Sequence, residues 1–158
     1  MTSSSLGFHL CGYRVSEELF RDAKTVVYRA EPIAPKSASP KSVIIKLLAA
    51  AYPTERELLN FRHQYLLLQG RDASTATHLD LPGVVRIYSL EASDLGYALV
   101  MEDFGGVSLV SYRQNNCLPL VDVLQIAIQL ADTLHALGRA RIVHKDLKPG
   151  NILINPTT

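Results

Sequence analysis

Short runs of β-branched and aromatic residues, set apart by polar or Gly- and Pro-containing segments, fill the N-terminal two thirds of the chain. Such runs are typical of β-strands. They predict strands, which we expect to be antiparallel, at five places: residues 13–20, 25–30, 42–48, 84–90 and 97–103. The segment 31–42 carries three prolines among serines and lysines, which indicates an exposed connection between two of these strands.

A helix interrupts the predicted strands between the third and the fourth. Residues 53–70 repeat apolar side chains at the spacing of one helix face, namely Leu58, Phe61, Tyr65 and Leu68. Thr54 and Glu57 form the S/T-x-x-E pattern of a capping box, and Gly70 is suited to end the helix. The polar segment 71–78 that follows is expected to be an insertion before the fourth strand.

A second, longer helix is predicted at residues 120–138, where one apolar stripe contains Val121, Leu124, Ile128, Ala131 and Leu134. Gly138 is suited to cap its C-terminus. The chain therefore changes near residues 104–108 from a strand-rich part into a helical part. This order predicts an α+β fold with a five-stranded antiparallel sheet and one helix, followed by the start of a helical region.

Composition and charge narrow the function classes. The chain has 158 residues, 47% of them hydrophobic, which suits one domain or part of a larger one. A formal net charge of +1 offers no basic field, so we expect neither nucleic acid nor an anionic membrane surface as a partner. The N-terminus lacks a signal-peptide pattern, and no run of about 18 apolar residues occurs. A cytoplasmic protein without a membrane segment is expected.

The two cysteines, Cys11 and Cys117, lie far apart in the sequence and form no C-x-x-C pair. They match neither a disulfide framework nor a zinc site. The histidines outside the segment discussed next show no paired ligand spacing, so we interpret them as surface or core residues. No metal site is predicted from these two residue types.

The segment "IVHKDLKPGNILIN" at residues 142–155 carries the clearest chemistry. His144, Asp146 and Asn151 satisfy the pattern H-x-D-x-x-x-x-N, and Lys148 stands two residues after the aspartate. An aspartate can orient a hydroxyl and accept its proton, an amide oxygen can hold a cation without adding charge, and a lysine can offset phosphoryl charge. A helix end followed by a polar turn would explain these residue types separately, but not their common order.

This segment resembles the catalytic loop of serine/threonine protein kinases. The resemblance implies that Asp146 is the catalytic base, Lys148 contacts the transferred phosphoryl group and Asn151 is a Mg²⁺ ligand, with ATP and Mg²⁺ as cofactors. His144 would hold the loop backbone in place. Lys145 stands where these kinases usually carry arginine, so the bidentate grip on a phosphorylated segment is expected to be lost.

The resemblance extends upstream. Lys46, in "VIIK", matches the strand lysine that contacts ATP phosphates, and Val27 matches the valine that follows the phosphate-covering loop. After the last strand, the carbonyl of Glu102 and the amide of Phe104 would face the adenine ring, with Met101 gating the pocket behind it. Residues 103–105 read D-F-G, yet they precede the catalytic loop, whereas the metal-binding D-F-G of kinases follows it. We interpret this tripeptide as part of the hinge.

Two departures from the kinase pattern argue for weakened catalysis. The three glycine positions of G-x-G-x-x-G are occupied by Phe20, Asp22 and Thr25, so side chains replace the bare backbone that approaches phosphates. Counting forward from Lys46 and back from "LPGVV", with 71–78 taken as an insertion, puts Gln64 at the place of the glutamate that pairs with Lys46. Its neutral amide cannot neutralise an ammonium. Glu57 is the fallback partner, although a helix cap is its more natural role.

Three readings of the function remain open. The first is a serine/threonine protein kinase domain, the second is a pseudokinase-like module that binds nucleotide or docks a partner, and the third is a small-molecule phosphotransferase. Enzymes of the third class share the H-x-D-x-x-x-x-N loop but usually lack a lysine at the place of Lys148. That residue favours a protein substrate.

The combination of "LPGVV", "GYALVMEDFGG" and "IVHKDLKPGNILINP" is similar to the amino-terminal kinase-like domain of large bacterial, especially cyanobacterial, sensor proteins. Those proteins continue into AAA-type ATPase, GAF and histidine kinase regions. The similarity implies an N-terminal kinase lobe at residues 12–103 and the hinge with the beginning of the C-terminal lobe at 104–158. Because only seven residues follow Asn151, we expect this domain to be incomplete, with protein substrates or downstream signalling domains as partners.

Overall fold

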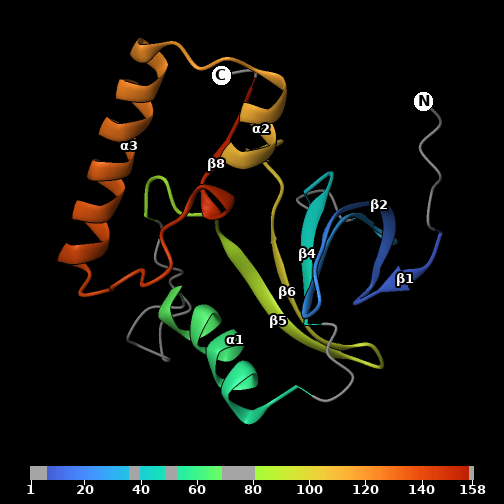
Figure 1. Cartoon of the computed structure of the whole chain (residues 1–158). Coiled ribbons are helices and arrows are strands. Elements are labelled where there is room, and N and C mark those ends of the chain that lie inside the picture. The colour runs from blue at the N-terminus through green and yellow to red at the C-terminus, as the bar shows by residue number, and fades with distance from the viewer. Residues whose placement is uncertain (1–6, 36–39, 49–52, 69–80, 157–158) are drawn as a thin grey trace. The chain divides into compact units, whose positions relative to one another are not determined.

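The computed structural model describes residues 7–35, 40–48, 53–68 and 81–156. The chain divides into two compact units, one made of Met1–Leu79 with Val85–Asp103 and the other of Asp80–Val84 with Phe104–Thr158. Gly70 and the predicted insertion at 71–78 lie outside the described residues. The two units are taken in turn (Figure 1).

The first unit contains an antiparallel sheet with the strand order β1-β2-β3-β4-β6-β5. The strands are β1 (His9–Leu10), β2 (Tyr13–Arg21), β3 (Thr25–Pro32), β4 (Val43–Leu48), β5 (Ile87–Ser93) and β6 (Gly96–Glu102). The predicted α+β class and the antiparallel pairing are confirmed. The sheet has six strands rather than five, because the two-residue β1 pairs with the start of β2.

The strand expected at residues 84–90 is displaced along the chain, since β5 spans Ile87–Ser93. Its ladder with β6 begins where Ile87 pairs with Met101. Just before it, the backbone N–H of Arg86 donates to the Glu102 carboxylate at 2.8 Å. The partner strand therefore sets where β5 begins, and apolar character alone did not reveal this.

Strict alternation in the central strands produces two apolar faces. In β4, Val43, Ile45 and Leu47 are buried and pack with Val100 of β6 and with residues of β2 and β3. Leu99, the neighbour of Val100, points to the opposite face and belongs to a second cluster. Successive side chains of a strand point to opposite faces, so both faces of the sheet centre are covered.

The helix α1 (Glu55–Leu68) covers the second of these faces, beside β5 (Figure 1). Its anchor is Phe61, which is buried against Ile87 and Leu99. The predicted capping box is confirmed, since the N–H of Thr54 donates to the Glu57 carboxylate at 2.8 Å and the N–H of Glu57 donates to the Thr54 hydroxyl at 3.3 Å. The helix thus begins where the sequence predicted.

The second unit contains the predicted long helix α3 (Leu120–Arg139) and a shorter helix, α2 (Leu109–Asn115), that the sequence analysis missed. Ser108 caps α2 by accepting from the N–H of Ser111 at 3.1 Å. A two-stranded ladder joins β7 (Val107–Ser108) to β8 (Leu153–Ile154), and the 3₁₀ turn η1 spans Pro149–Asn151. The serine cap was the available sequence signal for α2.

The prediction that Gly138 caps α3 is wrong. The helix continues through Arg139, and Arg141 takes the left-handed conformation with φ of 58°. The N–H of Arg141 donates to Gly138 O and the N–H of Ile142 donates to Leu137 O, both at 2.9 Å. These two bonds form the Schellman pattern that ends many helices, here with arginine at the position usually held by glycine.

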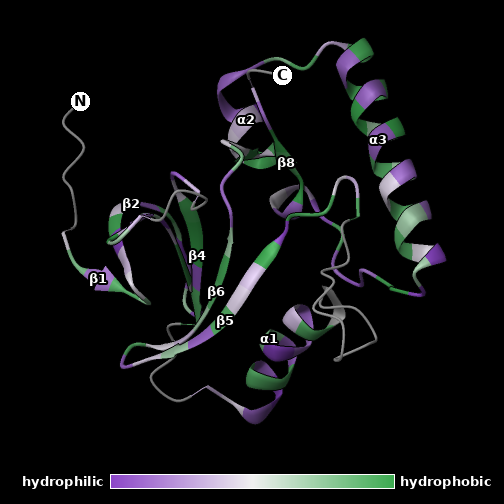
Figure 2. Cartoon of the chain, turned by 180° about the vertical axis from the view of Figure 1, so that it is seen from behind, coloured by the Kyte–Doolittle hydropathy of each residue, from purple (hydrophilic) through white to green (hydrophobic). Residues whose placement is uncertain are grey.

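Hydrophobic and hydrophilic residues are mixed along the helix α3 (Figure 2), and many of its apolar side chains are exposed. Leu120, Val121, Leu124 and Ile128 are exposed, and Leu137 is the buried residue of this helix. Among the described helices, α3 is the one that is long and apolar enough to cross a membrane, judged by length and composition alone. Core helices of soluble proteins pass the same test, so this observation carries little weight.

Candidate active site

In the first unit, Lys46 lies in the middle of the sheet, opposite Val27 of β3 and Leu99 of β6. Its Nζ donates to the Oε1 atom of Gln64 in α1 at 3.3 Å and lies 5.9 Å from the centre of the Phe61 ring. The helix residue reached by counting in the sequence is therefore the residue that contacts Lys46. A neutral amide accepts this bond, so the lysine keeps its charge without neutralisation by Gln64.

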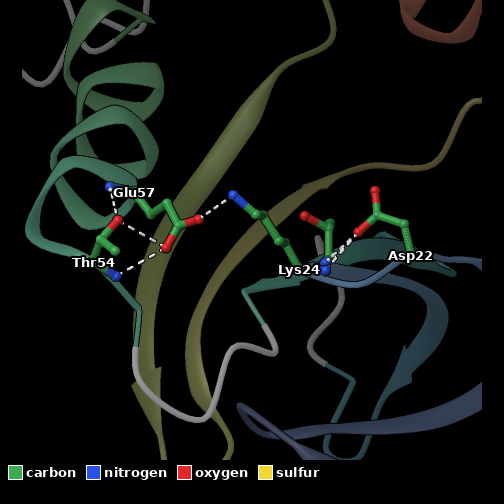
Figure 3. Close-up of polar contacts among 5 residues, drawn as sticks. Asp22, Lys24, Thr54 and Glu57 are labelled. Carbon is green, nitrogen blue, oxygen red and sulfur yellow. Dashed lines mark hydrogen bonds and ion pairs between the residues drawn. The ribbon is translucent and has the colours of Figure 1, made fainter.

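Glu57 is engaged elsewhere in the same unit (Figure 3). Its Oε1 atom lies 2.6 Å from Nζ of Lys24, in the turn between β2 and β3, and its other oxygen accepts from Thr54. The Lys24 ammonium, followed by the Thr54 donors, lowers the pKa of Glu57 to about 2. The structure shows Glu57 paired with Lys24 rather than in its fallback role as the partner of Lys46.

The positions expected to carry phosphate-loop glycines lie at the end of β2 and the start of β3. Phe20 is exposed and pairs with Val27, and Thr25 is the first residue of β3. The Oδ1 atom of Asp22 accepts from the N–H of Lys24 at 2.8 Å and from that of Thr25 at 2.7 Å. These two backbone bonds are the largest causes that lower the Asp22 pKa.

The last residues of β6 are fixed to the sheet from two sides. Glu102 takes its place opposite Val43, and its N–H donates to Arg86 O at 3.0 Å. Asp103 accepts from Nε of Arg29 at 2.8 Å, and Arg29 also pairs with Glu17 of β2. The sequence analysis missed Arg29, because an arginine in a strand gives no signal of a partner far along the chain.

In the second unit, Phe104 begins the segment that leads to α2. Its carbonyl accepts from Nδ2 of Asn155 at 3.0 Å. A Cβ atom on Gly106 would lie 2.4 Å from the Phe104 ring, so only glycine allows this ring to fold over the following backbone. Asn155, the last residue of the segment 142–155, therefore supports the backbone at residue 104.

The predicted catalytic residues meet on one short loop of this unit. The Oδ2 atom of Asp146 lies 3.0 Å from Nζ of Lys148 and 2.9 Å from Nδ2 of Asn151, which also donates to Asp146 O at 2.8 Å. Bonds from Lys148 and then Asn151 lower the pKa of Asp146. The carboxylate is accessible because it is exposed, and it is charged at neutral pH because its pKa is lowered.

Backbone hydrogen bonds and one left-handed residue shape this loop. The N–H of Asp146 donates to His144 O at 2.9 Å, and Lys145 between them has a left-handed φ of 62°. After η1, the carbonyl of Ile152 accepts from the N–H of Leu109 at 2.8 Å. The C-terminal end of the 3₁₀ turn is thereby tied twice, to the aspartate through Asn151 and to the start of α2 through Ile152.

The oxygen donors of this loop fit one part of a Mg²⁺ site. Mg²⁺ prefers carboxylate and amide oxygens and completes its shell with waters and substrate phosphates. Asn151 offers such an amide oxygen beside the Asp146 carboxylate. Within the described residues, no group of three or more His, Cys, Asp or Glu side chains could hold a metal ion. The loop alone therefore provides a single predicted protein ligand, Asn151.

Comparison with known proteins identifies the family. The sequence profile described as protein tyrosine and serine/threonine kinase matches residues 13–158. The chain belongs to this family. Part of a kinase domain of the serine/threonine type is therefore present, and the D-F-G tripeptide at 103–105 precedes the catalytic loop of that domain.

Several of the relatives named as serine/threonine-protein kinases come from bacteria. Serine/threonine-protein kinase PrkC of Bacillus subtilis is 35% identical over 82% of this chain, and PkaA of Streptomyces coelicolor is 30% identical over 92%. The chain spans 18% and 27% of the lengths of these two proteins. A crystal structure of the Mycobacterium tuberculosis PknI kinase domain matches with a TM-score of 0.71 and 21% identity, over 98% of this chain and 57% of that one. This likeness confirms the kinase fold.

Proposed function

We propose that this chain carries the nucleotide-binding and catalytic-loop parts of a bacterial protein kinase that transfers the γ-phosphoryl group of Mg-ATP to serine or threonine hydroxyls. The observation that supports this most strongly is the convergence of Asp146, Lys148 and Asn151 within 3.0 Å contacts on one exposed loop. Residues 12–103 would form the N-terminal lobe, and 104–158 the hinge and the beginning of the C-terminal lobe.

The proposed role of Asp146 is to orient the attacking hydroxyl and accept its proton. Because its pKa is lowered, the carboxylate is a weak base, and orientation of the nucleophile is the larger part of its contribution. Lys148, already beside this carboxylate, would neutralise charge that develops on the transferred group. When bound, Mg²⁺ supplies charge neutralisation of the phosphates, and Asn151 would be its ligand from this loop.

Most of the residues that would hold the nucleotide belong to the first unit. Lys46 would contact its phosphates, with Gln64 orienting the ammonium through the 3.3 Å bond. Val27 would pack on the adenine, while the carbonyl of Glu102 and the amide of Phe104 would hydrogen-bond to its edge. The proposed role of the Phe104 N–H is compatible with the bond to Asn155, because Nδ2 of Asn155 donates to the Phe104 carbonyl.

A protein substrate and downstream signalling domains are the proposed partners, with the cytoplasm as the proposed location. The protein-kinase names of the relatives support a protein substrate for this chain over a small alcohol. The similarity to large bacterial sensor proteins motivates the downstream domains. Neither nucleic acid nor a membrane segment is part of the proposal.

The test compares the natural full-length gene product with its Asp146→Asn variant in a phosphate-incorporation assay with Mg-ATP and a generic protein substrate. We expect loss of incorporation with unchanged thermal unfolding, because Asp146 is exposed and the amide is isosteric. Asp132→Asn, an exposed aspartate of α3, is the control and should leave incorporation unchanged. Equal incorporation by the Asp146 variant would overturn the assignment. Nucleotide binding without any transfer by the unsubstituted protein would favour the pseudokinase-like alternative.

A further inference from the structure

The turn between β2 and β3 is closed by its own carboxylate. Asp22 accepts the adjacent N–H groups of Lys24 and Thr25 on one oxygen, at 2.8 and 2.7 Å, and its own N–H donates to Thr25 O at 2.9 Å. Neighbouring backbone N–H groups that converge on one point form a typical anion-binding arrangement. In this turn, the anion that occupies it belongs to the chain.

The cation of the same turn is also engaged. Nζ of Lys24 lies 2.6 Å from Oε1 of Glu57, which stands in the first turn of α1 (Figure 3). Thr54 fixes the other Glu57 oxygen through its N–H and its hydroxyl, at 2.8 and 2.9 Å. Because Glu57 is anchored by the helix cap, it holds the Lys24 side chain toward α1.

The turn lies at the place where nucleotide phosphates are expected. It leads into β3, whose Val27 is the direct partner of Lys46, and Thr25 is two residues before Val27. The Lys46 charge is one of the lesser causes that lower the Asp22 pKa, after the two backbone bonds, so the Asp22 carboxylate lies within electrostatic reach of Lys46. An anion that approaches Lys46 therefore meets the negative charge of Asp22.

We infer that Asp22 and Glu57 act as built-in competitors of the nucleotide phosphates: Asp22 occupies the backbone N–H groups of the turn and Glu57 occupies Lys24. The inference rests on the proposed nucleotide-binding function. It assigns a specificity role to these two carboxylates. Phosphates would bind tightly only after two contacts are broken: that of Asp22 with the N–H groups of residues 24 and 25, and that of Glu57 with Lys24. The adenosine part of a nucleotide is not subject to this competition.

The test measures affinity for Mg-ATP and for adenosine by calorimetry on the natural full-length gene product. Asp22→Gly frees both N–H groups, while Asp22→Asn keeps an oxygen for the turn and removes only the charge. Glu57→Gln keeps an acceptor for Thr54 and releases Lys24. We expect each variant to bind Mg-ATP about tenfold more tightly, roughly the effect of one charge-assisted hydrogen bond, with adenosine affinity unchanged.

Asp94→Asn is the matched control, because Asp94 is an exposed aspartate in the turn between β5 and β6 at the same end of the sheet, beyond β4. It should leave both affinities unchanged. If the three variants bind Mg-ATP no more tightly, or if adenosine affinity changes equally, the inference is overturned while the proposed function stands. If the unsubstituted protein and all variants bind neither ligand, both the proposed function and the inference fail.

Discussion

The Nζ atom of Lys46 lies 3.3 Å from the Oε1 atom of Gln64, so the strand lysine of this kinase segment is met by an amide where a carboxylate is usual for the family. The contact joins the centre of the sheet to α1 without a counter-charge on the helix residue. The competing charges nearby, on Asp22 and in the Lys24–Glu57 pair, belong to the β2–β3 turn and the start of α1.

Gln64→Glu should convert this contact into an ion pair. We expect the free energy of unfolding to rise by about 0.5 kcal/mol at low ionic strength, as is typical of partly exposed pairs. The gain should shrink at about 1 M salt, where screening is strong. Urea unfolding at two salt concentrations measures it. Gln125→Glu, the same change at an exposed position of α3, is the control. An equal response in both variants would contradict an interaction with Lys46.

The Arg29–Asp103 pair is expected to contribute more to stability than any fully exposed pair. The Asp103 side chain is only 6% exposed and Arg29 is 30% exposed. Arg29→Met removes the guanidinium that pairs with this nearly buried carboxylate, so we expect a loss of about 2–3 kcal/mol in the free energy of unfolding. In the control pair, Arg14 and Glu31 are 62% and 48% exposed, and Arg14→Met should cost less than about 1 kcal/mol. Similar losses in urea unfolding would refute this ranking.

The Glu57 contacts should make stability depend on pH in the acidic range. Lys24 and Thr54 lower the pKa of Glu57 from 4.5 to about 2 in the folded chain. A depressed pKa means that the folded state favours the charged form, so the contribution is complete above about pH 4.5 and is lost as the pH falls toward 2.

Urea unfolding of the unsubstituted chain and of Glu57→Gln, followed from neutral pH downward, measures this contribution. The unsubstituted chain should be the more stable near neutrality, and the two free energies of unfolding should converge as the pH falls below the ordinary pKa of glutamate. Comparing the two forms at each pH removes the effect of all other titrating groups. A difference that stays constant over this range would show that the Glu57 charge does not act through its pKa.

The pKa of Asp146 should report the contacts of the catalytic loop. Lys148 is the largest cause of its lowering and Asn151 the next. We therefore expect Lys148→Met to raise the pKa of Asp146 more than Asn151→Leu does, as followed by NMR titration of the carboxyl carbon. Lys145→Met is the matched control, since Lys145 is a neighbouring lysine that is not among the causes. If Lys145→Met shifted the titration as much as Lys148→Met, the 3.0 Å contact would not be the cause.

Local sequence patterns were sufficient for most elements of the first unit. The capping box of Thr54 and Glu57 and the alternation of Val43, Ile45 and Leu47 operate within a few residues, so their signals are visible without knowledge of the fold. Position 64 was also found by counting forward from Lys46 and back from "LPGVV", and in the structure Gln64 contacts Lys46. Glu57, the fallback partner of Lys46, instead pairs with Lys24 of the β2–β3 turn.

Some element bounds escaped the sequence, either because a partner strand lies elsewhere in the chain or because the local signal is weak. The start of β5 is set by β6, and the end of α3 is set by a Schellman pattern that uses Arg141 where Gly138 was expected. The helix α2 carries no clear apolar stripe, and its serine cap was its only strong signal.

The sequence by itself determined the kinase class of the fold and the order Asp146, Lys148, Asn151, because catalytic chemistry on one short loop is encoded by spacing along the chain. The tertiary structure decided which charges meet: Arg29 with Asp103, 74 residues later, and Lys24 with Glu57. Coulomb attraction acts through space, and strand register and helix packing bring such charges within reach of each other. The occupied state of the β2–β3 turn is therefore a property of the folded sheet and helix together.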